Sequence, residues 1–177
     1  MGNNEAKNKI PFGKLIVISL LVIAVYAVER FLLSGVTKVE GVKIGLYNMF
    51  MVFAIINMKT RHAYFFLLVK LIAGIFLAVQ VIFYPLAGGI LSIAFMALCN
   101  KLFKNKIGYV GIGIIGALVY NLTVYAIAAM SLQSTAVLYN IPKVLLLSAV
   151  YGALTGSFAF VIKKTNILRL GYGENNE

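Results

Sequence analysis

Long apolar blocks separated by short polar segments make up most of this sequence. A helix that crosses the hydrocarbon core of a bilayer needs about 20 predominantly apolar residues, and most of the blocks approach that length. The blocks are Leu15–Leu33, Ile44–Met58, Ala63–Phe83, Leu86–Phe103, Ile107–Met130 and Val144–Ile162. The pattern predicts an all-α integral membrane protein, a bundle of six transmembrane helices over residues 15–164, with cytoplasmic tails at 1–14 and 165–177.

Composition supports this prediction. The chain is 62% hydrophobic and only 12% charged, whereas soluble domains have about 25% charged residues. The first block follows a basic segment, as a signal peptide would, but Glu29 and Arg30 end it and no small-x-small cleavage pattern follows. We therefore expect it to remain as an uncleaved helix.

The net charge of +11 is explained by membrane topology. If the N-terminus is cytoplasmic, inner segments hold eleven lysines and arginines and outer segments hold four. Such an excess favours an orientation with both termini inside, as a multi-pass protein of the bacterial cytoplasmic membrane. The lysines form no basic stripe, so nucleic acid is not an expected partner.

One charged residue falls deep inside an apolar block. Lys70 lies about eight residues, or about 12 Å, beyond the basic turn before the third block. A lysine at that depth costs about 2.5–3.5 kcal/mol on insertion, so it needs a partner, a cavity or a ligand. The alternative is that its side chain reaches back to the inner surface.

Other unusual residues fall at the outer ends of the predicted helices. Lys43 lies between two glycines, which allow close approach of the backbone, and Asn48 follows one turn later. We expect these residues, with Lys70, to contribute to a substrate-binding site; the others are Gly88, Gly89, Asn121, Tyr139, Asn140 and Lys143. For Asn121, hydrogen bonding between helices is an equal alternative, and Tyr139 also suits an interfacial anchor.

Glu29 and Arg30 end the first block, and we expect them to face water; pairing with each other or with Lys43 is the alternative. Cys99 is the one cysteine, which excludes an intrachain disulfide, and the carboxylates are scattered, so we expect no metal site and no intrinsic cofactor. No set of catalytic side chains stands out, and we do not expect an enzyme.

Small residues recur every four positions in the last block, at Ser148, Gly152 and Gly156. Such a stripe lets another helix approach closely. The partner helix is either another helix of the same bundle or a separate membrane subunit.

Five short motifs, in order, resemble a known family. They are Gly41–Asn48 (glycine-x-lysine-x-glycine-leucine-x-asparagine), Lys70–Gly74, Pro85–Gly89, Tyr120-Asn121 and Tyr139–Pro142. They resemble the Gx transporter family, often labelled heptaprenyl diphosphate synthase component I. This family is similar to the substrate-binding S-components of energy-coupling factor (ECF) transporters. The chain departs from the pattern at Tyr47, where the family tends to have a smaller residue, and at Lys70, where the family usually has arginine.

The resemblance implies a six-helix bundle that binds a small vitamin- or cofactor-like molecule on its outer side. It would associate with an ECF coupling subunit and two ATPase subunits. The chain has no Gly-rich phosphate loop, so ATP would be hydrolysed only by those partners. Flavin-, quinone- or isoprenoid-related ligands are the expected candidates, with lysines for an anionic group and aromatic side chains for a ring.

Two other functions remain open. The chain is alternatively a non-transporting membrane subunit of an extracellular electron transfer or quinone- or flavin-linked redox system, or an accessory component of a prenyl diphosphate synthase. It has no heme or iron–sulfur ligand set. It also contains no aspartate, whereas prenyl diphosphate synthesis needs acidic clusters that hold magnesium on diphosphate.

Overall fold

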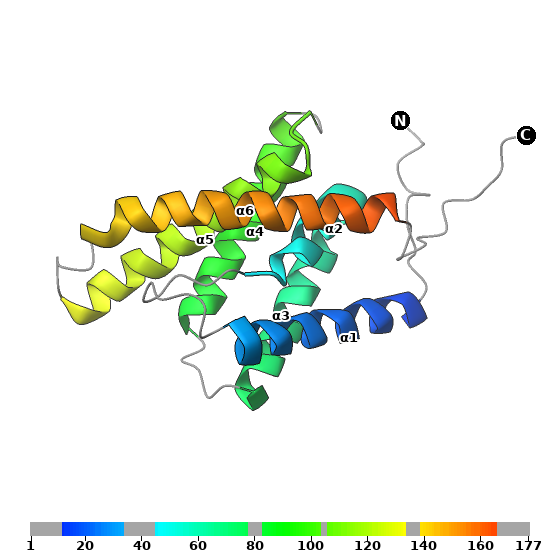
Figure 1. Cartoon of the computed structure of the whole chain (residues 1–177), viewed down its shortest axis with the longest axis horizontal. Coiled ribbons are helices and arrows are strands. Elements are labelled where there is room, and N and C mark those ends of the chain that lie inside the picture. Colours follow the sequence, from blue (N-terminus) through cyan, green and yellow to red (C-terminus); the bar gives the residue numbers. More distant parts are fainter. Residues whose placement is uncertain (1–11, 34–44, 78–82, 104–105, 134–138, 166–177) are drawn as a thin grey trace, which may run out of the picture.

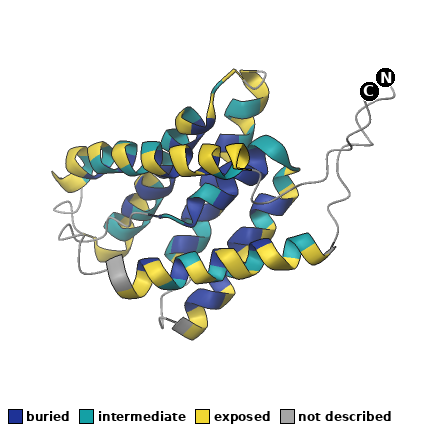
Figure 2. Ribbon diagram, turned by 45° about the vertical axis from the view of Figure 1, so that its right-hand side comes forward, coloured by how far each residue is buried: buried dark blue, intermediate teal, exposed yellow. Residues whose placement is uncertain are grey.

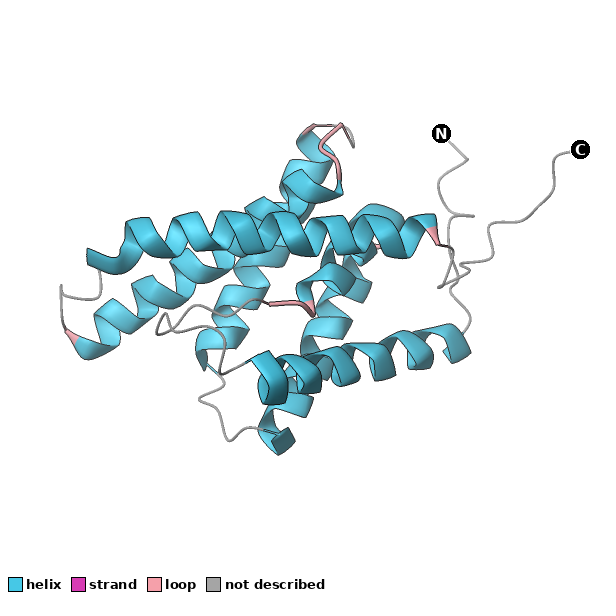
Figure 3. Ribbon diagram, viewed as in Figure 1, coloured by secondary structure: helices cyan, strands magenta, loops and turns pink. Residues whose placement is uncertain are grey.

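The structure is a computed structural model that describes residues 12–33, 45–77, 83–103, 106–133 and 139–165. Within these residues every regular element is a helix and no strand is present (Figure 3). In chain order the elements are α1 (Phe12–Val28), the π-helical turn η1 (Glu29–Leu33), α2 (Asn48–Asn57), α3 (Thr60–Leu77), α4 (Phe83–Leu102), α5 (Tyr109–Leu132) and α6 (Ile141–Lys164).

The chain is membrane-embedded. Among the described residues, α4, α5 and α6 have 20, 24 and 24 residues and are apolar and long enough to cross a bilayer. Large apolar side chains cover the outer surface, and Phe76 and Leu146 are 84% and 71% exposed. In water such a surface would be unfavourable, whereas in a membrane it faces lipid. The start of α1 and the end of α6 lie at the same end of the molecule (Figure 1).

The short helix α2 lies at the centre of the bundle. It has ten residues, seven of them buried, and it packs against α3, α4, α5 and α6 (Figure 1). Helix α1 lies on one side of the molecule against α3, and α5 pairs with α6 on the other. Burial is concentrated in the central helices, while α1 and α6 present exposed outer faces (Figure 2). Six α-helices lie among the described residues, and three of them are long and apolar enough to cross a bilayer. Because α2 is too short to cross a full bilayer, the six crossings stay a prediction.

Glycine allows α5 and α6 to pack with their backbones in contact. A Cβ at Gly152 would lie 2.6 Å from Ile114 Cα, and one at Gly156 would lie 2.5 Å from the Tyr109 carbonyl oxygen. Ser148 belongs to the same face and is fully buried. The stripe predicted to meet a partner helix is therefore used within the chain, and the reading of these three residues as a docking face for a separate subunit is wrong.

Helix boundaries differ from prediction around the third and fourth blocks. Phe83 begins α4 and does not end the preceding helix. The expected outer turn at Tyr84-Pro85 is instead the first turn of α4, where proline is tolerated because the missing N–H has no intrahelical acceptor. The second block also starts later, because Gly45–Tyr47 form a turn before α2.

Candidate binding site

A buried carboxylate connects the end of α1 to the start of α2. Glu29 is only 9% exposed, and its Oε1 accepts a hydrogen bond from the Gly45 N–H at 2.6 Å. The backbone amides of Leu46 and Tyr47 also face this carboxylate. Gly45 has a φ of 69°, a left-handed conformation that favours glycine and that sets the turn before α2. The carboxylate thus lies at the positive end of the α2 dipole.

Lys70 lies within a group of tyrosines, near enough to this carboxylate to attract it. It is 3% exposed, and its Nζ lies 4.6 Å from the Tyr47 ring centroid and 5.6 Å from that of Tyr26. Both distances are within the range for cation–π attraction. The ammonium also attracts Glu29 electrostatically. Lys70 therefore does not reach back to the inner surface, and that alternative is wrong.

Tyr120 of α5 completes the cluster. Its hydroxyl and that of Tyr47 are hydrogen-bonded to each other, and the Tyr47 ring meets the Tyr26 ring edge-on at 6.0 Å. Gly88 of α4 lies against Tyr120, because a Cβ there would be 3.0 Å from its ring. We call Tyr26, Glu29, Tyr47, Lys70 and Tyr120 the tyrosine–lysine cluster; it joins α1, η1, the start of α2, α3 and α5.

Two oxygens of the cluster have no hydrogen-bond partner among the described residues. They are the Tyr26 hydroxyl and Glu29 Oε2, and both are buried. Tyr26 and Glu29 lie three residues apart, one turn along the same face at the end of α1. An unsatisfied buried polar atom costs about 1–3 kcal/mol. The cluster is therefore a place where a ligand can supply missing hydrogen bonds.

Three of the predicted site residues lie in or beside this cluster. Lys70 is a member, Gly88 borders Tyr120, and Asn48 is buried directly after Tyr47 at the start of α2. Lys43 lies outside the described residues.

The structure places the other predicted residues elsewhere. Gly89 lets α4 approach Leu67 of α3, and Asn121 donates to the Ser148 hydroxyl at 2.8 Å, which is the helix-to-helix alternative. Three others, all exposed, lie at the start of α6 and contribute nothing to the cluster; they are Tyr139, Asn140 and Lys143.

Comparison with known families adds a decisive observation. Residues 18–162 match the family model described as heptaprenyl diphosphate synthase component I. This chain belongs to the heptaprenyl diphosphate synthase component I family. The resemblance drawn from its motifs is confirmed, and the match includes every residue of the tyrosine–lysine cluster. No curated protein and no solved structure matches the chain.

The sequence alone did not predict most of the tyrosine–lysine cluster. Glu29 was expected to face water, but it is buried, because Gly45 and its neighbours supply backbone donors. Tyr26 was not singled out, and Tyr120 was named only as part of the Tyr120-Asn121 motif and not as a site residue. The spacing of Tyr26 and Glu29 could have indicated the site, since residues three apart share a helix face. A carboxylate in an apolar block is also costly unless it has a partner.

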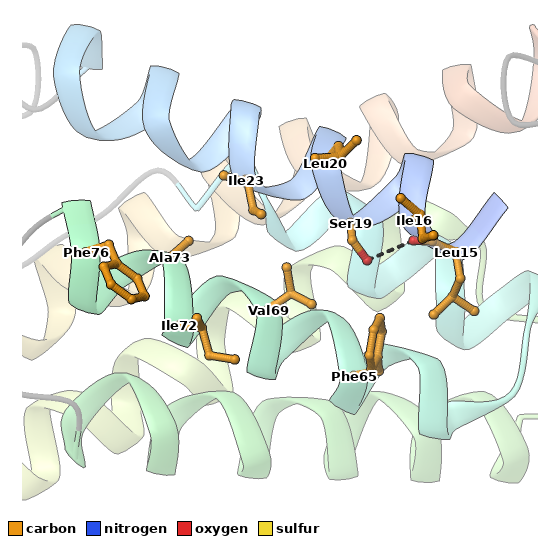
Figure 4. Close-up of a pocket in the computed structure, with 10 residues that line it drawn as sticks. All are labelled: Leu15, Ile16, Ser19, Leu20, Ile23, Phe65, Val69, Ile72, Ala73 and Phe76. Atoms are coloured by element: carbon orange, nitrogen blue, oxygen red, sulfur yellow. Dashed lines mark hydrogen bonds between the residues drawn. The ribbon is translucent and has the colours of Figure 1, made fainter. Parts of the chain in front are cut away.

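An apolar groove of about 550 Å³ separates α1 from α3 on the outer surface of this family member (Figure 4). Its walls are aliphatic and aromatic, and its one polar side chain, Ser19, donates to the Leu15 carbonyl oxygen at 2.8 Å. The groove offers no group that would orient a polar ligand. Among the described residues no group of three metal-ligating side chains is present.

Proposed function

We propose that this chain is a membrane-embedded, non-catalytic binding subunit of the ECF S-component type, which takes up a small vitamin- or cofactor-like molecule. The observation that carries the proposal is the tyrosine–lysine cluster. It brings together a cation, a carboxylate and three aromatic rings from α1, η1, α3, α5 and the turn before α2. Ionisable groups inside a membrane are expensive and usually mark a substrate or ion pathway.

The cluster suits recognition better than chemistry. Lys70 and Glu29 carry opposite charges that attract each other. The tyrosines offer ring faces and hydroxyls, which are groups that fix a ligand's orientation. Transport energy would come from ATPase subunits coupled to the chain through a membrane partner. The orientation with six crossings and both termini inside the cell belongs to this proposal.

A second candidate function follows from the family description. A heptaprenyl diphosphate synthase component that lacks aspartate would act as an accessory subunit beside a catalytic partner. A membrane subunit of a redox system is the third candidate, and it would hold a flavin or quinone without any metal ligand set of its own.

Gentle purification from the native membrane, followed by mass spectrometry of proteins and small molecules, tests these functions. We expect a coupling subunit and ATPases to co-purify, together with a small molecule that the Lys70→Met variant no longer retains. Lys106→Met is the matched control, because it removes the same charge from an exposed position between α4 and α5. Co-purification of a prenyl synthase or a redox protein in place of ATPases would contradict the transport proposal.

A further inference from the structure

The two buried oxygens without partners narrow the class of ligand, if the proposed binding function holds. Glu29 and Tyr26 lie three residues apart, about one helical turn, and neither Glu29 Oε2 nor the Tyr26 hydroxyl has a hydrogen-bond partner among the described residues. The other carboxylate oxygen is already occupied by the Gly45 N–H. A ligand that binds here must therefore match what Oε2 and the hydroxyl lack.

An ionised carboxylate oxygen accepts hydrogen bonds and cannot donate them, whereas a tyrosine hydroxyl can do both. The matching ligand edge has an N–H that donates to Glu29 Oε2 beside a carbonyl that accepts from the Tyr26 hydroxyl. We infer that the ligand is a planar heterocycle with such a lactam or imide edge, held between Glu29 and Tyr26 with its ring among the tyrosines.

This inference separates the three ligand types that the sequence left open. Flavins carry an imide N–H between two carbonyls. Quinones present carbonyl acceptors only, and isoprenoids present an apolar chain. Either would leave Glu29 Oε2 buried and unsatisfied, and sites built to hydrogen-bond a donor strongly reject analogues that lack it.

Binding of four defined probes to the detergent-purified full chain tests the inference. The probes are riboflavin, its N3-methyl derivative, menadione and farnesyl diphosphate, measured by equilibrium dialysis. The chain has no tryptophan, which simplifies a parallel measurement by flavin fluorescence. We expect riboflavin to bind and N3-methylation to weaken its binding by roughly tenfold or more, because the N–H that donates to the carboxylate is lost. This comparison uses the unaltered protein, so it does not depend on any variant folding.

Variants then locate the interaction. Glu29→Gln puts an amide donor opposite the ligand N–H, and Tyr26→Phe removes the hydroxyl; we expect each to weaken riboflavin binding by roughly tenfold. Tyr151→Phe is the matched control, because Tyr151 is half-buried on α6 beside Tyr125 and Val144 and outside the cluster. The Tyr151→Phe variant should bind riboflavin with the same affinity as the unaltered chain.

Three other outcomes of the binding experiment would contradict the inference about the ligand edge. Retention of menadione or farnesyl diphosphate in place of riboflavin overturns the inference about the ligand edge but leaves the binding function intact. Equal binding of riboflavin and its N3-methyl derivative also overturns it. Binding of none of the probes overturns the inference about the ligand edge, whereas the proposed function is decided separately by the proteins and small molecules that co-purify from the native membrane.

Discussion

Two single residues, Glu29 and Lys70, carry the buried charges of the tyrosine–lysine cluster. Glu29 and Lys70 are buried close enough to attract each other, and each also has neighbours that compensate its desolvation. For Glu29 these are backbone amides, and for Lys70 they are the rings of Tyr26 and Tyr47. Removing one partner leaves the other charge buried with less compensation, while removing both leaves two neutral groups.

We therefore predict that Lys70→Met lowers the stability of the protein by about 3 kcal/mol, the lower end of the range for breaking a buried charge pair, because Glu29 keeps its Gly45 bond. The double variant Lys70→Met/Glu29→Gln should recover most of that loss. Thermal unfolding can be followed with a thiol-reactive dye, since Cys99 is the one cysteine of the chain and is partly buried.

The control for this cycle is Lys106→Met, which should melt as the unaltered chain does. A double variant that melts no higher than Lys70→Met would mean that the two charges are independent, and the coupling described for the cluster would be wrong.

The cluster also shows how far single residues can be interpreted from sequence. Lys70 stood out because a charge inside an apolar block is rare and costly. Glu29 did not, because it lies at the end of a block, where water and protein are equally plausible surroundings. Its burial depends on the N–H of Gly45, sixteen residues away. It also depends on the turn at Gly45, whose positive φ only glycine readily adopts. Tyrosines recur throughout the chain, and no local pattern tells which three converge.

At the scale of elements, apolar length and the small-residue stripe were the reliable signals. The blocks predicted the helices, with errors at their ends where Pro85 permits a helix to start. The stripe on α6 predicted close packing but not its partner, because small residues four apart serve an internal helix and an external subunit equally well. Only the position of α5 decided between them.

We predict that Gly152→Ala destabilises the α5–α6 pair by about 1–3 kcal/mol, the usual cost of overpacking. The added Cβ would lie 2.6 Å from Ile114 Cα and 2.7 Å from the Gly113 carbonyl oxygen. Backbone atoms cannot rotate away as a side chain would. The measurement is the same dye-based melting curve.

Gly13→Ala is the matched control for that substitution. Nothing lies within 4 Å of a Cβ at Gly13, which is in the first turn of α1. Its melting temperature should be unchanged or slightly higher, because alanine is the better helix former by about 1 kcal/mol. If Gly152→Ala behaves in the same way, the close backbone contact between α5 and α6 is not present.

The whole molecule is a bundle with an apolar outer surface and a polar interior cluster, the reverse of a soluble domain. This distribution agrees with its membrane character, and the shared end of the α1 start and the α6 end agrees with an even number of crossings. The direction of those crossings is inferred from the excess of lysine and arginine in the segments predicted to be cytoplasmic, because positively charged loops favour the cytoplasmic side.

We predict that both termini are cytoplasmic and that the end of α5 is outside. In a Cys99→Ala background, Ser131→Cys should react with a membrane-impermeant maleimide in intact cells. Gly2→Cys and Asn175→Cys should react only after the cells are permeabilised. Ser131 is exposed near the end of α5, so its access is not limited by packing. The opposite labelling pattern would invert the topology, and labelling of the two termini on different sides would exclude an even number of crossings.

The shortness of α2 has a consequence for how the protein is made. Ten residues rise about 15 Å, half of the hydrocarbon thickness, so α2 alone is a weak signal for the insertion machinery. Only Met58 and Lys59 separate it from α3, against which it packs. We therefore expect the two helices to enter the lipid as one hairpin, so that Lys70 reaches the bilayer together with Tyr47, whose ring lies 4.6 Å from its Nζ in the turn before α2.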